Sequence, residues 1–154
     1  MNVNASWLLD YDVQVASSLP SFSYKDSIGS QYGAQYKFKT MTNIGYAVGG
    51  ASLNLSWRHL PKVRHNSLVT NPASTTLPTS SYELFGLTGR WNINDTLSLR
   101  GGVDNLFDRR PVIVGANWVP TANGSGVVSA VGTTDTSNYD IIGRRYYVGF
   151  NAKF

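Results

Sequence analysis

Apolar and polar residues alternate along six stretches of the chain, and each alternation predicts a β-strand with one apolar and one polar face. In the first stretch every odd position from Val3 to Val15 is apolar, and the even positions are polar except at Leu8. This stretch is much longer than the usual strand of about 5–6 residues, which favours a barrel wall. The six predicted strands are 3–15, 36–48, 51–60, 82–92, 96–105 and 144–154.

The last stretch alternates up to the final residue. Its apolar positions are Tyr146, Val148, Phe150, Ala152 and Phe154, and the positions between them are polar or small. A tilted strand that spans a bilayer needs about 9–11 residues, and this stretch has that length. Aromatic residues at both ends suit the two interfacial girdles of an outer-membrane strand. We therefore expect a membrane-spanning strand, although an edge strand of a soluble sandwich would also alternate.

The connections between the predicted strands alternate in length. Segments rich in Ser, Thr, Asn, Gly and Pro occupy 17–33, 61–81 and 108–141, and short turns lie between them at 49–50 and 92–95. Transmembrane barrels have short periplasmic turns and longer extracellular loops, whereas a soluble sandwich has no reason to separate them strictly. The sequence therefore predicts an all-β, antiparallel, six-stranded meander, curved as a section of a large transmembrane barrel, with Phe154 at the periplasmic end.

Composition agrees with this interpretation and excludes several classes of function. Only 14% of residues are charged, against about 25% in ordinary soluble domains. The net charge of +4 is scattered, so we expect no nucleic-acid partner. There is no Cys, and His59 and His65 lack metal-ligand spacing, so we interpret both histidines as loop surface. We expect no metal, no cofactor and no enzymatic activity, since no nucleophile motif occurs and the Asp10–Asp12 pair is explained as lumen-facing.

Two segments resemble a known family. The run Val103-Asp104-Asn105-Leu106-Phe107-Asp108 resembles the end of the penultimate strand of TonB-dependent outer-membrane receptors. The segment from Gly143 to Phe154 resembles the last strand of these receptors, which ends the protein on Phe. The Trp57-Arg58 pair is similar to one that is often met two hairpins earlier.

The resemblance implies that residues 1–154 are the C-terminal part of such a receptor in the Gram-negative outer membrane. A receptor of this kind imports a scarce nutrient such as a ferric siderophore through a plugged barrel of about 22 strands. The plug, the earlier strands and the motif that couples to TonB are expected elsewhere. The sequence opens without a signal peptide, so we expect a fragment, a mature chain or a mis-called start. Six strands alone would leave two unpaired edges, which lipid does not tolerate.

The resemblance also suggests roles for particular residues. Tyr146, Val148, Phe150 and Phe154 would close the barrel and present the signal that the barrel-assembly machinery recognises. Ligand-contact candidates are Trp118 in the longest loop, together with Arg100 and Arg145 on an inferred lumen face. Trp118 could instead pack between loops or sit in the girdle, and the arginines could instead pair with Asp104 or with plug carboxylates. The alternatives for the whole chain are a small self-contained barrel that acts as an adhesin or structural protein, and a soluble sugar-binding sandwich.

Overall fold

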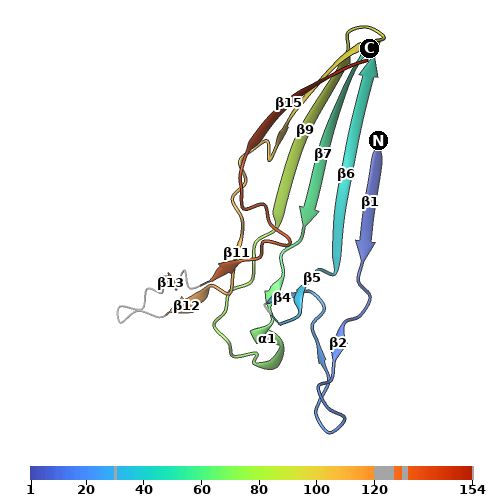
Figure 1. The fold of residues 1–154 in the computed structure, drawn as a ribbon. Helices are drawn as coiled ribbons and strands as arrows, with labels where there is room; N and C mark the ends of the chain where they lie inside the picture. Colours follow the sequence, from blue (N-terminus) through green and yellow to red (C-terminus); the bar gives the residue numbers. More distant parts are fainter. Residues whose placement is uncertain (30, 120–126, 130–131, 154) are drawn as a thin grey trace.

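Six long strands form one antiparallel sheet in a computed structural model that describes residues 1–29, 31–119, 127–129 and 132–153. The sheet order is β1-β6-β7-β9-β10-β15, so each long strand pairs with the next long strand along the chain (Figure 1). The predicted all-β, six-stranded antiparallel meander is therefore confirmed. The strands are β1 (Asn2–Trp7), β6 (Phe38–Val48), β7 (Ala51–Leu60), β9 (Tyr82–Asn92), β10 (Leu97–Asp104) and β15 (Arg145–Ala152).

Short elements fill the three long connections, which gather at the end of the sheet opposite the two short turns (Figure 1). Antiparallel pairs form between β2 and β3, β4 and β5, β11 and β14, and β12 and β13, and β4 also pairs in parallel with β8. No helix in the described part of the chain is long and apolar enough to cross a bilayer. The short elements are β2 (Asp12–Val13), β3 (Phe22–Ser23), β4 (Ser27–Gly29), β5 (Gly33–Gln35), β8 (Arg64–His65), α1 (Ser67–Thr70), β11 (Ile113–Val114), β12 (Asn117–Val119), β13 (Val127–Ser129) and β14 (Thr133–Thr134).

The register of the sheet brings the apolar positions of all six strands onto one face. Residues that pair directly across two strands point to the same side. Leu55 pairs with Ile44 and Leu87, and Leu99 pairs with Trp91 and Phe150, so one apolar face continues across the sheet. Its side chains are largely exposed, and Phe150 is 80% exposed. The other face carries the polar positions.

The predicted first strand, 3–15, is wrong in its extent. β1 ends at Trp7, and Asp12–Val13 pair with Phe22–Ser23 in a separate hairpin. The alternation continues past Trp7, but the neighbouring strand β6 begins only at Phe38, which is the partner of Trp7. A single further bond runs from the Leu8 N–H to the Lys37 carbonyl at 3.0 Å. Without a partner strand the alternating segment leaves the sheet.

The hydrophobic core lies under the long connections and not within the sheet. Ile28 and Tyr36 come from the first connection, Val63 from the second, and Val114 and Tyr139 from the third. They pack together with Leu60 and Tyr82 at the ends of β7 and β9. The hydroxyl groups of Tyr36 and Tyr139 are hydrogen bonded at 3.0 Å. This shared core holds the three connections together.

Candidate functional site

The turn after β10 is built around Asn105. This residue has a positive φ of 53° and is only 2% exposed. Asn tolerates the left-handed conformation better than most residues because its short amide can bond locally. Here its Oδ1 accepts from the Arg109 N–H at 2.6 Å, and its Nδ2 donates to the Arg109 carbonyl at 3.0 Å. Nδ2 also donates to Asp140 Oδ2 at 3.1 Å, which ties the turn to the segment before β15.

Asp140 and Arg145 form the second part of this junction. Asp140 Oδ1 accepts from Arg145 Nη1 at 3.0 Å and from the Ile142 N–H at 3.1 Å. Burial alone would raise the pKa of Asp140, but these hydrogen bonds and the charge of Arg145 outweigh it and lower the pKa. Arg145 Nε also lies 3.8 Å from Asp104 Oδ2 on the neighbouring strand. The first residue of β15 is therefore fixed by two carboxylates.

A third contact completes the junction at the base of the longest connection. Asp108, which also has a φ of 53°, accepts a hydrogen bond at Oδ1 from the Arg144 N–H at 3.1 Å. Asn105 and Asp108 are the polar ends of the Asn-Leu-Phe-Asp run, and both bind the segment that enters β15. In this chain the two segments that carry the family resemblance are therefore in direct contact.

The structure separates two of the three ligand-contact candidates, Arg100 and Arg145. Arg145 is paired with Asp104 and Asp140, in line with the alternative that the arginines form ion pairs. Arg100 lies on β10 four residues before Asp104, the partner of Arg145, and pairs with Arg90 on β9 and Gly149 on β15. Arg100 makes no ion pair in the described part of the chain. The backbone of Trp118 belongs to β12, but its side chain lies outside what the structure describes, so its role stays a prediction.

The residues predicted to close the barrel lie on the outermost strand. Tyr146, Val148 and Phe150 point to the apolar face of β15 and are 71%, 78% and 80% exposed. Among the described strands, β15 pairs only with β10, so its other edge is free. Phe154 lies outside the described residues. Barrel closure and insertion stay predictions.

His59 does not lie on the loop surface, as the sequence suggested, but in β7 on the apolar face. Its Nδ1 is 2.5 Å from Glu83 Oε1, and Trp57 Nε1 donates to Glu83 Oε2 at 2.6 Å. Its ring stacks on Phe38 with centroids 5.5 Å apart. Both carboxylate oxygens of Glu83 therefore have a polar partner on the apolar face, His59 Nδ1 and Trp57 Nε1. His65 is in β8 within the loop end, and burial lowers its pKa.

Aromatic residues form a band at each end of the apolar face. Trp57 stacks on Phe85 near the long connections, with centroids 5.9 Å apart, whereas Trp91 and Tyr46 lie towards the short turns. Phe85 and Trp91 are six residues apart on β9, which is roughly 20 Å at the rise of an antiparallel strand. Strands of outer-membrane barrels are tilted by about 35–45°, so this separation corresponds to roughly 15 Å along the membrane normal, within an apolar band that is about 25 Å tall.

Two hollows adjoin on the polar face beneath the third connection. One has a volume of about 400 Å³ and the other about 360 Å³, and Met41 and Arg58 line both. Together they reach from β1 to β15. Arg58 Nη2 donates to the Asn138 carbonyl at 2.9 Å, which holds the third connection over the sheet. Their size is within the range of about 300–1,000 Å³ that is usual for ligand pockets.

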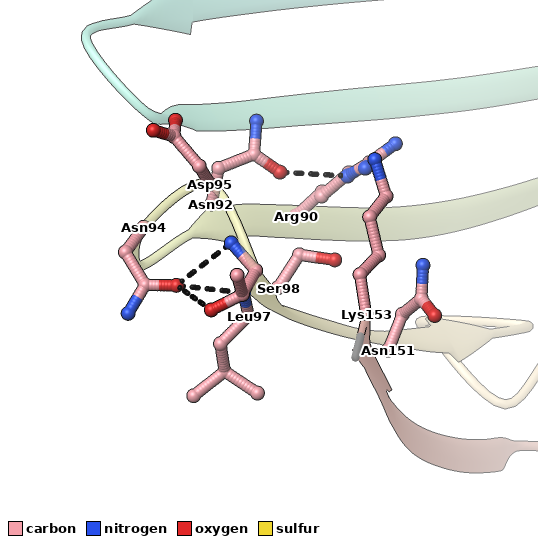
Figure 2. A pocket seen from close by; sticks show the side chains of 9 residues that line it. Arg90, Asn92, Asn94, Asp95, Leu97, Ser98, Asn151 and Lys153 are labelled. Atoms are coloured by element: carbon pink, nitrogen blue, oxygen red, sulfur yellow. Dashed lines mark hydrogen bonds between the residues drawn. The ribbon is translucent and has the colours of Figure 1, made fainter.

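A smaller hollow of about 240 Å³ lies at the opposite end, beside the turn between β9 and β10 (Figure 2). Asn94 Oδ1 accepts from the Thr96 and Leu97 N–H groups at 3.0 and 2.7 Å, and Arg90 Nε donates to Asn92 Oδ1 at 3.1 Å. These bonds stabilise the turn, and Figure 2 shows the long side chain of Lys153 beside them. We assign no ligand to this hollow.

Two receptors of known name are similar to this chain in sequence. No family model matches. The ferric enterobactin receptor of Pseudomonas aeruginosa is 37% identical over 90 residues, which are 58% of this chain and 11% of that protein. The ferrienterobactin receptor of Escherichia coli is 34% identical over 76 residues, or 49% of this chain and 10% of that protein. The matched part therefore spans about a tenth of the length of either relative.

A solved structure of a ferric enterobactin receptor mutant from Pseudomonas aeruginosa, in complex with enterobactin, also matches. It is 23% identical with a TM-score of 0.49, and the match covers 77% of this chain and 16% of that one. The two sequence matches confirm the resemblance: over about half of its length, this chain is similar to a segment of TonB-dependent ferric siderophore receptors.

Proposed function

We propose that this chain is the C-terminal barrel segment of a TonB-dependent outer-membrane receptor that takes up a ferric siderophore. The proposal rests on the agreement between the sequence matches and a sheet that has one apolar and one polar face. Both matched relatives are named as receptors for ferric enterobactin. The sheet divides its connections into long and short ones as such a barrel wall does, and β6, β7 and β9 have 11, 10 and 11 residues, enough to cross a bilayer. The described parts of β1, β10 and β15 are shorter, with 6, 8 and 8 residues.

The apolar face of the sheet supports a membrane location. Val148 and Phe150 are 78% and 80% exposed, and Trp7 is 69% exposed at the other edge. A bilayer supplies the apolar surroundings that these side chains need, and the polar face then lines the interior of the barrel. A sugar-binding sandwich would instead cover this face with a second sheet. Among the described strands, β1 and β15 each pair on one side only, and further strands of the receptor would pair with their other edges.

This function implies several partners. Outer-membrane lipid contacts the apolar face, and the earlier strands and the plug complete the receptor. The TonB energy-coupling complex acts through the N-terminal part, and the barrel-assembly machinery recognises the strand that ends at Phe154. The three long connections face the outside of the cell and close over the ligand.

Uptake of radioactive iron tests the proposed function. The gene that encodes this chain is deleted in its own host, and uptake from ferric enterobactin and from other ferric siderophores is measured under iron limitation. We expect uptake of at least one siderophore to be lost, to return with the intact gene, and to stop when the proton-motive force is dissipated. Unchanged uptake of every siderophore, together with no binding by the purified receptor, would contradict the proposal.

A further inference from the structure

One carboxylate and one imidazole lie on the apolar face of the sheet. Among the described residues of the six long strands, Glu83 and His59 are the only charged or imidazole side chains on this face. They are direct partners on β9 and β7, at the end of the sheet beside the long connections (Figure 1). The apolar face therefore becomes polar where a bilayer would pass from hydrocarbon to headgroups.

The carboxylate of Glu83 can accept further hydrogen bonds. His59 Nδ1 lies 2.5 Å from its Oε1, and Trp57 Nε1 donates to its Oε2 at 2.6 Å. A carboxylate offers about four lone-pair sites, so these two partners leave part of its capacity unused. The side chain of Glu83 is 37% exposed, and a hydroxyl or N–H group outside the protein can reach it.

Aromatic rings continue from Glu83 across this end of the sheet. Trp57 is the cross-strand partner of Phe85, and their rings stack with centroids 5.9 Å apart. Phe107, which follows β10, meets Phe85 edge to face at 5.3 Å and is 67% exposed. We call Trp57, Phe85 and Phe107 the aromatic strip. The C–H face of a sugar ring and an acyl chain both pack well on flat apolar surfaces of this kind.

A cation lies at the far end of the aromatic strip. Arg144 immediately precedes β15, and its Nη1 donates to the Tyr146 hydroxyl at 3.4 Å. Tyr146 pairs with Val103, which also pairs with Leu87, so Tyr146 points to the apolar face and Arg144 reaches over that face. Asp108 accepts from the backbone N–H of Arg144. Because its guanidinium forms no ion pair with any described residue, its charge is available to an anion.

The register sets the width of this surface. Arg144 lies two residues before Tyr146, and Phe85 lies two residues before Leu87, so Arg144 and Phe85 are at about the same height. They are two strand spacings apart, or about 10 Å. Trp57 lies one strand further, so the row from Trp57 to Arg144 spans about 15 Å. A phosphorylated disaccharide is of this width.

We propose that this end of the apolar face binds the phosphorylated sugar headgroup of a glycolipid in the outer leaflet of the outer membrane. Arg144 pairs with a phosphate, and the aromatic strip packs against the sugar rings and the first part of the acyl chains. Glu83 accepts from a sugar hydroxyl or amide N–H. A glycerol phospholipid has the phosphate but no sugar ring for the strip and Glu83. The site rests on the membrane location in the proposed function and adds to it the class of lipid that the receptor binds.

Binding of lipid A, a phosphorylated disaccharide lipid, to the full-length receptor in mild detergent tests the site. Native mass spectrometry measures the affinity of wild type and Arg144→Gln for lipid A with its phosphates and after their enzymatic removal. We expect Arg144→Gln to weaken binding of the phosphorylated lipid about 3- to 10-fold, the loss of one charge-assisted bond at an exposed site. Removal of the phosphates should weaken binding to wild type at least as much, and binding to the variant much less.

Two further variants test the sugar contacts, and a third is the control. Phe107→Ala and Glu83→Gln should weaken binding of phosphorylated and dephosphorylated lipid A by the same factor, because neither side chain contacts the phosphate. Lys153→Gln removes a cation from the opposite end of the sheet, beside the turn between β9 and β10 (Figure 2). This variant should bind both lipids as wild type does.

Equal affinity of wild type and Arg144→Gln for phosphorylated lipid A would overturn the site. Equal affinity of wild type for lipid A and for phosphatidylglycerol, or displacement of lipid A by inorganic phosphate, would overturn the assignment to a glycolipid. Binding of ferric enterobactin, measured in the same samples, should be equal in wild type and Arg144→Gln. If the wild-type receptor binds no ferric siderophore, the proposed function fails, whichever lipid the receptor binds.

Discussion

Asn105 and Asp140 are hydrogen bonded across 35 residues of sequence, with Nδ2 donating to Oδ2 at 3.1 Å. The contact joins the turn after β10 to the segment before β15 and closes the base of the longest connection. Asn105 is 2% exposed, so its amide is satisfied by protein groups and not by bulk water. The contact gives the Asn-Leu-Phe-Asp run a structural role in this chain, as the anchor for the last strand.

We predict that Asn105→Ala destabilises the folded receptor by about 1–3 kcal/mol, because Asp140 and the Arg109 backbone lose a buried partner. Denaturant unfolding in detergent measures the free energy. Asn151→Ala, on the exposed polar face of β15, is the control and should stay within about 0.5 kcal/mol of wild type. Equal stability of the two variants would show that the Asn105 contacts contribute nothing.

The stability of the receptor should fall in acid through Asp140. The pKa of this carboxyl is lowered in the folded state from its ordinary 3.8, so the unfolded chain binds protons more readily. The contribution of Asp140 to the free energy of unfolding is present above pH 3.8, and it is lost as the pH falls through the lower pKa of the folded state. Asp140→Asn should flatten this part of the curve of unfolding free energy against pH. A variant curve parallel to that of wild type would contradict the assignment.

Charges placed on the two faces of β7 should have unequal costs. Leu55 lies between the aromatic bands on the apolar face, paired with Ile44 and Leu87, whereas Asn54 points to the polar face. Leu55→Arg should cost about 2–4 kcal/mol in a bilayer, and Asn54→Arg far less. Reversible unfolding from lipid vesicles measures both. Similar costs would mean that the apolar face does not contact lipid.

The long connections should be reachable from outside the cell. Thr75 is exposed in the second connection, and Asp95 is exposed in the turn between β9 and β10. Cysteines are placed at these positions in a receptor without other accessible thiols and treated on whole cells with an impermeant maleimide. Thr75→Cys should react at once and Asp95→Cys only after lysis. The reverse order would invert the proposed orientation.

The extent of each strand could be predicted where the alternation ends at a turn signal. The predicted bounds of β7 and β9 agree with the structure, since Gly49–Gly50 precedes β7 and Pro61 follows it. The first predicted strand failed beyond Trp7 because strand length depends on the partner strand as well as on the pattern. Alternation alone contains no information about where β6 begins.

The candidate site could be predicted only in part. The Asp104–Arg145 pair follows from two strands that share a face, so sequence reasoning could anticipate it. The bonds of Asn105 to Asp140 and of Arg58 to Asn138 depend on how long polar connections fold back, which no local pattern specifies. The core formed by Ile28 and Tyr139 was missed for the same reason, because single apolar residues in polar segments carry no periodicity.

The central claim, that one face of the sheet contacts lipid, is tested most directly on β15. Spin labels are placed one at a time at Tyr146, Tyr147, Val148, Phe150 and Asn151 in the receptor reconstituted in bilayers. Collision rates are measured with lipid-soluble oxygen and with a water-soluble nickel chelate. We predict high oxygen collision rates at 146, 148 and 150 and low rates at 147 and 151. Uniform rates along the strand, or the opposite alternation, would contradict a lipid-facing wall.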